Sequence, residues 1–134
     1  NLIRYVTEAR AKGGIPILLT PVARRKFDSS GHVEGTHEAY SALVRQVAAD
    51  NKVTLIDLDS KSQQLLQEWG EKKSALLFNH LSPGEHPNYP EGKEDNTHFN
   101  ELGARVIAEL VLKEIRRSIP ELASHIITVP PAKN

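Results

Sequence analysis

The stretch of sequence that decides the fold is Ile15-Pro16-Ile17-Leu18-Leu19-Thr20. Its residues are apolar at both alternating positions, which suits a strand buried beneath helices on both faces of a parallel sheet. Pro16 fits such a strand only near its start, because proline has no N–H to donate to a neighbouring strand. A second apolar run covers residues 53–58. The sequence therefore predicts two buried parallel strands of an α/β fold.

Helical periodicity surrounds both runs. Apolar residues three or four apart predict helices over residues 2–12, after Thr36 as N-cap, after Asp59, around Leu76, Leu77 and Leu81, and after Asn100 as N-cap. The apolar faces are expected to include Tyr40, Leu43, Val44, Val47 and Ala48 in the second helix, and Leu102, Val106, Ile107, Leu110, Val111 and Ile115 in the last. Residues 82–92 are expected to form a Pro/Gly loop and residues 118–134 an irregular tail. The alternation of helices and strands indicates right-handed crossovers in one α/β domain.

Two parallel strands are too few for a stable sheet, because a parallel sheet needs neighbouring strands and helices on both faces. The sheet is expected to be completed either by sequence upstream of Asn1 or by a second copy of the chain. The first is favoured, since the chain begins without Met and directly in a helical pattern.

The composition narrows the classes of partner. Lys plus Arg and Asp plus Glu number 17 each, so no net charge attracts a phosphate backbone or an anionic membrane. The absence of cysteine excludes disulfides and thiolate metal sites. No apolar run reaches the roughly 18 residues that span a bilayer. Nucleic acid and membranes are therefore not expected as partners, while the oligomeric state is left open.

The candidate chemistry lies beyond the carboxyl ends of the strands, where open α/β sheets bind their ligands. In Asp95-Asn96-Thr97-His98, the spacing allows one turn to bring the carboxylate to one nitrogen of the imidazole. A carboxylate in that place fixes the tautomer of the imidazole and supports the charge it gains as a general base. The competing interpretation is a turn before the last helix in which Asp95 binds only backbone N–H groups.

A metal site is the other alternative, since His80, His86 and His98 together with Asp95 are ligands that suit zinc. Their spacing matches no regular zinc pattern, and no His-Glu-x-x-His helix is present. No metal or other cofactor is therefore expected. The remaining histidines are interpreted as solvated or capping residues.

Basic and aromatic residues at the same rim are candidates for substrate binding. Arg24 and Arg25 follow the first strand, and their planar guanidinium groups suit a carboxylate-bearing substrate such as a uronic acid polymer. The alternative for this segment is a solvated turn. Tyr89 in the Pro/Gly loop is placed to stack on a sugar ring, whereas Trp69 is expected in the core. The predicted substrate-binding residues are Arg24, Arg25, His86 and Tyr89.

Four segments together carry a resemblance to a known family. They are Pro16-Ile17-Leu18-Leu19-Thr20-Pro21-Val22 with Arg24-Arg25-Lys26-Phe27, Leu55-Ile56-Asp57-Leu58, Pro83-Gly84-Glu85-His86-Pro87-Asn88-Tyr89-Pro90-Glu91-Gly92, and Asp95-Asn96-Thr97-His98-Phe99 leading into Gly103-Ala104-Arg105. The combination resembles the rhamnogalacturonan acetylesterase-like branch of the GDSL/SGNH hydrolases, over residues 2–117. Its specificity lies in the combination, since each segment alone is common.

The resemblance implies a three-layer α/β/α sandwich around a flavodoxin-like parallel sheet, of which residues 1–117 would be the C-terminal part and residues 118–134 a tail. It implies an enzyme that removes acetyl groups from plant polysaccharides such as rhamnogalacturonan, and a secreted or periplasmic location. By position, His98 would be the general base and Asp95 the residue that orients it.

The chain departs from the family pattern in one large respect. The Gly-Asp-Ser block that carries the nucleophile, and the later Gly and Asn of the oxyanion hole, are absent from these 134 residues. One oxyanion donor alone is typically worth about 3 kcal/mol of transition-state stabilisation. The isolated chain is therefore expected to lack useful activity and to fold poorly. The alternative function is a noncatalytic carbohydrate-binding or scaffold domain of the same fold.

Overall fold

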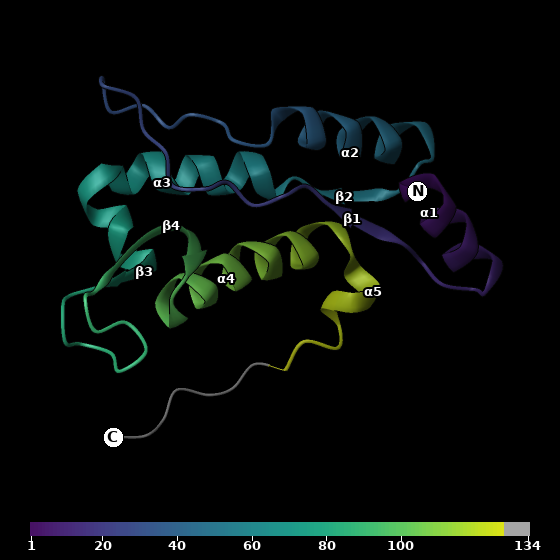
Figure 1. Cartoon of the computed structure of the whole chain (residues 1–134). Helices are drawn as coiled ribbons and strands as arrows, with labels where there is room; N and C mark the ends of the chain where they lie inside the picture. Colours follow the sequence, from purple (N-terminus) through teal and green to yellow (C-terminus); the bar gives the residue numbers. More distant parts are fainter. Residues whose placement is uncertain (128–134) are drawn as a thin grey trace.

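The computed structural model describes residues 1–127, in which helices and strands alternate through the first half of the chain (Figure 1). The elements are α1 (Leu2–Ala11), β1 (Ile17–Leu19), α2 (Glu38–Asp50), β2 (Thr54–Ile56), α3 (Leu58–Ser74), the 3₁₀ helix η1 (Ala75–Leu77), β3 (Phe78–Leu81), β4 (Lys93–Phe99), α4 (Glu101–Ser118) and α5 (Pro120–Ala123). Within the described part of the chain, no helix is both long and apolar enough to cross a bilayer.

The two predicted strands form a parallel pair, but the predicted burial on both faces is wrong for the first of them, since Ile15 is 80% and Leu19 42% exposed. Leu18 is opposite Leu55, with one further residue pair on each side of them. Helix α2 contacts both strands and helix α4 contacts β2, and Figure 1 shows the two helices on opposite sides of the strands. The predicted α/β class is confirmed, because each apolar strand meets a helix as the sequence pattern requires.

A polar cluster joins the carboxyl ends of β1 and β2. Thr20 donates from its hydroxyl to Oδ1 of Asp57 at 3.0 Å, and the same hydroxyl accepts the backbone N–H of Asp59 at 2.8 Å. Arg45 on α2 donates to both carboxylates over 2.8–2.9 Å. The acidic residues after β2 are therefore used to join α2 to the sheet.

The short helix predicted after Gly70, around Leu76, Leu77 and Leu81, is correct only as far as Leu77. Gly70 lies inside α3 with φ 69°, so the helix kinks there and continues only to Ser74. After the short η1, residues from Phe78 onward pair antiparallel with β4 instead. Phe78 is 1% exposed and its ring centroid is 4.7 Å from that of Phe99. Pairing with β4 has therefore overridden the helical spacing at Leu81.

Several smaller expectations also differ from the structure. Helix α2 begins at Glu38 with His37 as its N-cap residue, because the hydroxyl of Thr36 instead accepts the backbone N–H of Arg24 at 3.2 Å. The predicted tail contains α5, which follows the buried Ile119, while residues 128–134 lie outside the described residues. The N-cap at Asn100 is confirmed, since its side chain accepts the N–H of Gly103 at 3.0 Å.

The core lies between the segment after β1, α3 and the β3–β4 hairpin. Its buried members are Ala23, Leu66, Leu77 and Phe78, and the half-buried Trp69 packs against them as expected. Phe99, which follows the predicted catalytic residue His98, is among the half-buried residues that pack against this cluster.

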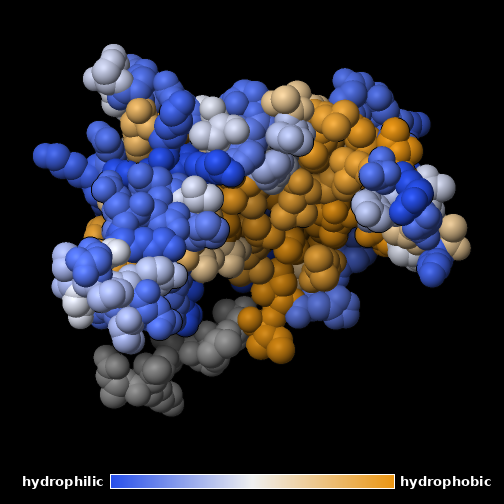
Figure 2. Space-filling view, in the orientation of Figure 1, coloured by the Kyte–Doolittle hydropathy of each residue, from blue (hydrophilic) through white to orange (hydrophobic). Residues whose placement is uncertain are grey.

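A second apolar area is exposed. Figure 2 shows apolar atoms gathered over the part of the molecule where β1 and α5 lie in Figure 1. An open cavity of about 320 Å³ in this area is lined by Ile15, Ile17, Ile119 and Leu122.

Three residues that the helical patterns placed on buried faces are exposed instead: Tyr40, Leu43 and Leu102 are 69%, 58% and 48% exposed. Each of β1 and β2 has a single strand partner among the described residues.

Replacing Gly103 by alanine is expected to destabilise the protein by about 1–3 kcal/mol. Gly103 is buried where α4 approaches η1, and a Cβ there would overlap the carbonyl oxygen of Leu77 and lie 2.8 Å from a ring carbon of Phe99. The measurement is urea unfolding of the full-length protein. At an open helical position the same change would stabilise by about 1 kcal/mol, so a gain in stability would contradict the close approach.

Candidate active site

The antiparallel register of β3 and β4 breaks at the predicted catalytic segment. Asn79 is opposite Asp95, whereas the preceding residue, Phe78, is opposite Phe99. Moving one residue along β3, from 79 to 78, therefore corresponds to moving four residues along β4, from 95 to 99. Residues 96–98 have no opposite residue and form a bulge. Bulges occur next to active sites because they redirect side chains away from the ladder. The predicted turn before the last helix is therefore a bulge within a strand.

Both carboxylate oxygens of Asp95 are engaged. Oδ1 accepts the backbone N–H groups of Thr97 at 2.8 Å and of His98 at 2.9 Å. Oδ2 is 2.8 Å from Nδ1 of the His98 imidazole. These donors, the backbone N–H of His98 first, hold the pKa of Asp95 well below its usual range. The sequence suggested two contacts for Asp95, one with backbone N–H groups and one with the imidazole of His98. The carboxylate makes both, so it stabilises the bulge and orients the imidazole.

The hydrogen bond to Asp95 fixes the tautomer of His98. An ionised carboxylate can only accept, so Nδ1 carries the proton and Nε2 keeps a lone pair. The side chain of His98 is 76% exposed, whereas that of Asp95 is 11% exposed. Among the described residues, no side chain forms a hydrogen bond with Nε2. The arrangement can therefore accept a proton from a group that approaches the open side of the imidazole, and its catalytic role stays a prediction.

Lys93 is a further charged group at this carboxylate, and the sequence reasoning missed it. Its ammonium is 3.3 Å from Oδ2 of Asp95, the oxygen that also binds His98. The hydrogen bond with Asp95 raises the pKa of Lys93, so the ammonium is charged at neutral pH. The same group lies 4.6 Å from the ring centroid of Tyr89. Lys93 thus connects the Asp95 carboxylate with the Pro/Gly loop.

Replacing Lys93 by methionine is expected to lower the Tm of the full-length protein at pH 7, because the Asp95 carboxylate loses an ammonium that lies 3.3 Å away. The pKa of Lys93 is raised in the folded protein, so its charge stabilises the fold up to the unfolded pKa of about 10.4, and that contribution is lost as the pH rises further. The measurement is thermal unfolding followed by circular dichroism between pH 7 and pH 11, where the difference from the native protein should shrink. Lys93→Arg, which keeps the charge, should retain the native Tm, and a methionine variant with the native Tm at pH 7 would contradict the ion pair.

The predicted substrate-binding residues lie in two places. Arg24 is exposed after β1, and its neighbour Arg25 is half-buried with its guanidinium bonded to protein acceptors. His86 and Tyr89 face each other across the Pro/Gly loop, with ring centroids 5.6 Å apart at 45°. Contact of any of these residues with a substrate stays a prediction.

The alternative metal cluster does not assemble among residues 1–127, where no three His, Asp or Glu side chains converge on one point. His80 and His86 have separate partners: Nε2 of His80 is 2.9 Å from the Asn96 side-chain oxygen, and Nδ1 of His86 accepts the backbone N–H of Asn88 at 3.2 Å. Two of the proposed ligands are thus engaged in hydrogen bonds to the protein itself.

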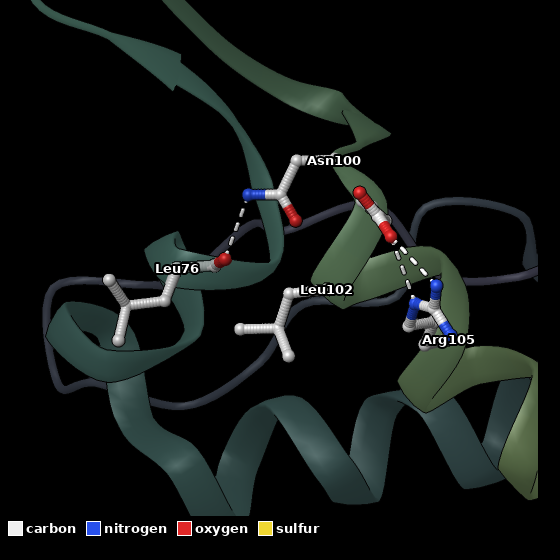
Figure 3. Close-up of a pocket in the computed structure, with 5 residues that line it drawn as sticks. Leu76, Asn100, Leu102 and Arg105 are labelled. Atoms are coloured by element: carbon white, nitrogen blue, oxygen red, sulfur yellow. Dashed lines mark hydrogen bonds and ion pairs between the residues drawn. The ribbon is translucent and has the colours of Figure 1, made fainter.

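An open cavity of about 550 Å³ lies where α4 begins (Figure 3). Leu76 and Leu102 form its apolar wall, and the side-chain nitrogen of Asn100 donates to the Leu76 carbonyl oxygen at 2.9 Å. The Glu101–Arg105 ion pair forms its polar side. Neither Asp95 nor His98 lines this cavity, so the dyad stands on an open surface outside it.

Comparison with known proteins finds relatives that are named rhamnogalacturonan acetylesterases, although no family model matches the chain. Rhamnogalacturonan acetylesterase RhgT from Bacillus subtilis is 39% identical over 127 residues, which are 95% of this chain and 55% of that protein. Probable rhamnogalacturonan acetylesterase YesY from the same organism is 36% identical over 86% of this chain and 48% of its own length. The chain thus spans about half the length of these curated relatives.

A solved structure agrees with these relatives. The crystal structure of YxiM from Bacillus subtilis matches with a TM-score of 0.69 and 26% identity, over 87% of this chain and 29% of that one. YxiM is named an uncharacterised esterase. By sequence and structure, this chain is similar to two rhamnogalacturonan acetylesterases and to an esterase of known structure, which confirms its resemblance to the rhamnogalacturonan acetylesterase-like branch of the GDSL/SGNH hydrolases.

Proposed function

We propose that this chain supplies the general base and its orienting carboxylate to a serine esterase that removes acetyl groups from a rhamnogalacturonan-like polysaccharide. The observation that carries the proposal is the 2.8 Å contact between Oδ2 of Asp95 and Nδ1 of His98, with Nε2 exposed and unpaired among the described residues. A base of this kind acts on a group that reaches it from outside the β4 bulge.

Formation of the acetyl-serine needs two proton transfers at Nε2 of His98. In the first, Nε2 takes the hydroxyl proton of a serine whose oxygen attacks the acetyl carbonyl, and Asp95 stabilises the imidazolium that forms. The tetrahedral intermediate then collapses, and the imidazolium gives that proton to the departing sugar oxygen. Water, activated by the same nitrogen, cleaves the acetyl-serine to acetate and free enzyme.

The serine and the oxyanion donors belong, on this proposal, to sequence outside these 134 residues. Within the described part of the chain no serine hydroxyl is hydrogen-bonded to His98. The exposed apolar area beside β1 supports the same idea, because further strands and helices would cover it and complete a three-layer α/β/α sandwich. The isolated 134-residue chain should accordingly release no acetate.

The substrate class rests on the names of the two curated relatives and on groups around the dyad. The exposed Arg24 suits the carboxylates of a uronic acid polymer. Tyr89, connected to the dyad through Lys93, offers an aromatic face to a sugar ring. A polymer of plant cell walls lies outside the cell, so the proposal includes a secreted or periplasmic enzyme.

The test is acetate release by the full-length protein from acetylated rhamnogalacturonan, with acetylated xylan as a second polymer and the saponified rhamnogalacturonan as blank. The proposal expects release from the first polymer at a higher kcat/KM than from xylan. Binding to the saponified and acetylated polymers without any acetate release would instead support a noncatalytic carbohydrate-binding domain. Equal rates on both acetylated polymers would contradict the proposed substrate class.

A further inference from the structure

Arg25 bonds to the β4 bulge through both its backbone and its side chain. Its backbone N–H donates to the carbonyl oxygen of Asn96 at 2.9 Å. One terminal nitrogen of its guanidinium, Nη1, donates to the side-chain oxygen of the same asparagine at 2.6 Å. Asn96 is the first residue of the bulge and follows Asp95 directly. Arg25 therefore holds the residue between the catalytic carboxylate and the rest of the bulge.

The other guanidinium nitrogens are fixed on the kinked end of α3. Nη2 donates to the carbonyl oxygen of Glu71 at 2.6 Å, and Nε donates to the hydroxyl of Ser74 at 3.2 Å. Ser74 is fully buried, and its hydroxyl in turn donates to the Glu71 carbonyl oxygen at 3.2 Å. The kink at Gly70, with φ 69°, precedes both acceptors. The guanidinium thus bridges the packed end of α3 and a bulge that lies outside the β3–β4 ladder.

Asn96 is held from a second side by His80 on β3. The oxygen Oδ1 of Asn96 faces a guanidinium that can only donate, so it must accept from Nε2 of His80 as well, at 2.9 Å. One acceptor atom therefore joins α3, through Arg25, to β3, through His80. Buried and half-buried networks of this kind restrict movement more than any single bond.

We propose that Arg25 is a positioning residue for the Asp95–His98 dyad, because it locks Asn96 and with it the bulge that carries the imidazole. This inference rests on the proposed esterase function of that site. Residues 96–98 have no backbone pairing with β3, so they are placed by side-chain bonds from Asp95, from His80 and, outside the hairpin, from Arg25. All three nitrogens of the Arg25 guanidinium donate to protein acceptors, so this group is used within the protein and not for binding a carboxylate of the substrate.

The expected effect is on the chemical step. A base acts within hydrogen-bonding distance of the proton that it takes, and a misplacement of about 1 Å can lower the rate on the order of a hundredfold. Arg25→Ala should therefore lower kcat about 10- to 100-fold with little change in KM, for a small aryl acetate as well as for the polymer. Arg25→Lys should not restore kcat, since one ammonium cannot reach three separated acceptors.

The experiment is a double-mutant cycle on the full-length protein with Arg25→Ala, Asn96→Ala and the double variant. If the two residues act through one bond, the double variant should be no slower than the slower single variant. The second readout is the proton NMR signal of Nδ1–H in His98, which should broaden in each variant as the imidazole loses its fixed place. Arg116→Ala, an exposed arginine in the last turn of α4, is the matched control and should keep kcat within twofold.

Three results would overturn the inference. Additive losses in the cycle would separate Arg25 from Asn96, and a rise in KM for the polymer alone would make Arg25 a substrate contact. An unchanged Nδ1–H signal in a folded but slow Asn96→Ala variant would show that the bulge is not held this way, even if Arg25→Ala fails to fold. His98→Ala is measured in parallel: if it keeps full activity, the proposed function itself fails and the positioning role falls with it.

Discussion

His98→Ala in the full-length protein is expected to lower kcat for an aryl acetate by about 10³- to 10⁴-fold. The variant loses the one nitrogen that can accept the serine proton, while Asp95 remains ionised with no imidazole to orient. KM should change little, because the imidazole acts in proton transfer and not in binding the acetyl group. The measurement is initial-rate kinetics at pH 7.5, with circular dichroism to verify the fold.

His32 offers a matched control for that variant. Its imidazole is 73% exposed and lies 3.7 Å from a carboxylate oxygen of Asp28, so it repeats the exposure and the acidic neighbour of His98 outside the bulge. His32→Ala should keep kcat within about twofold. Equal losses in the two variants would point to a general effect on the fold, and unchanged turnover in His98→Ala would remove the general base from the account.

Asp95→Asn is expected to lower kcat by about 10²- to 10⁴-fold. An asparagine amide can donate to Nδ1, which favours the tautomer with the proton on Nε2 and so blocks the base. It also loses the charge that holds Lys93 and that would stabilise the imidazolium. The loss should appear in kcat for both the polymer and the aryl acetate.

The same variant makes a prediction about stability and pH. The pKa of Asp95 is depressed in the folded protein, so its carboxylate stabilises the fold above the unfolded pKa of about 3.9 and loses that contribution as the pH falls. Asp95→Asn should have a lower Tm than the native protein at pH 7, and the difference should shrink toward pH 3. A difference that does not depend on pH would contradict this role of the charge.

Asp28→Asn is the control for both measurements. The carboxylate of Asp28 accepts the backbone N–H groups of Ser30 at 2.8 Å and of His32 at 2.9 Å, as that of Asp95 does for the bulge. Its pKa is also lowered, the His32 N–H being the first cause. The variant should show a comparable dependence of Tm on pH but an unchanged kcat, because no predicted catalytic group depends on it.

The parts of the fold that local sequence determines were predicted well. The apolar run that starts at Ile15 predicted a strand, and Ile17–Leu19 pair with β2 as expected, although Ile15 and Leu19 are exposed where the pattern predicted burial. Asn100 sits before a long apolar stripe and caps α4 as expected. In both cases the chemistry of a few neighbouring residues decides the structure.

The hairpin could not be predicted in this way. Leu76, Leu77 and Leu81 have spacing that fits a helix, but Leu76 and Leu77 end the helix in η1, and only the pairing of residues 78–81 with residues 93–99 makes Leu81 part of a strand. The bulge has no local signal either, since its three extra residues are defined by the register of two strands. The Asp-x-x-His spacing predicted the contact of the two side chains, but not the bulge that produces it.

Long-range contacts explain the remaining omissions at the site. Arg25 and Asn96 are 71 residues apart, and no pattern within either segment indicates that one binds the other. Lys93 is two residues from Asp95, a spacing that puts both side chains on one face of a strand, but the sequence did not predict that residues 93–99 form a strand. Both residues gain a role only once the hairpin has brought the bulge against α3 and the Pro/Gly loop.

The central claim is that His98 activates a serine that lies outside these 134 residues, and an alkyl fluorophosphonate tests it most directly. This reagent transfers its phosphonyl group to an activated serine and releases fluoride, and mass spectrometry of the full-length protein locates the modified residue. The account predicts one modified serine, outside residues 1–134, whose labelling slows at least a hundredfold in His98→Ala. Modification of Ser29, Ser30 or Ser82, or labelling at the native rate without His98, would contradict it.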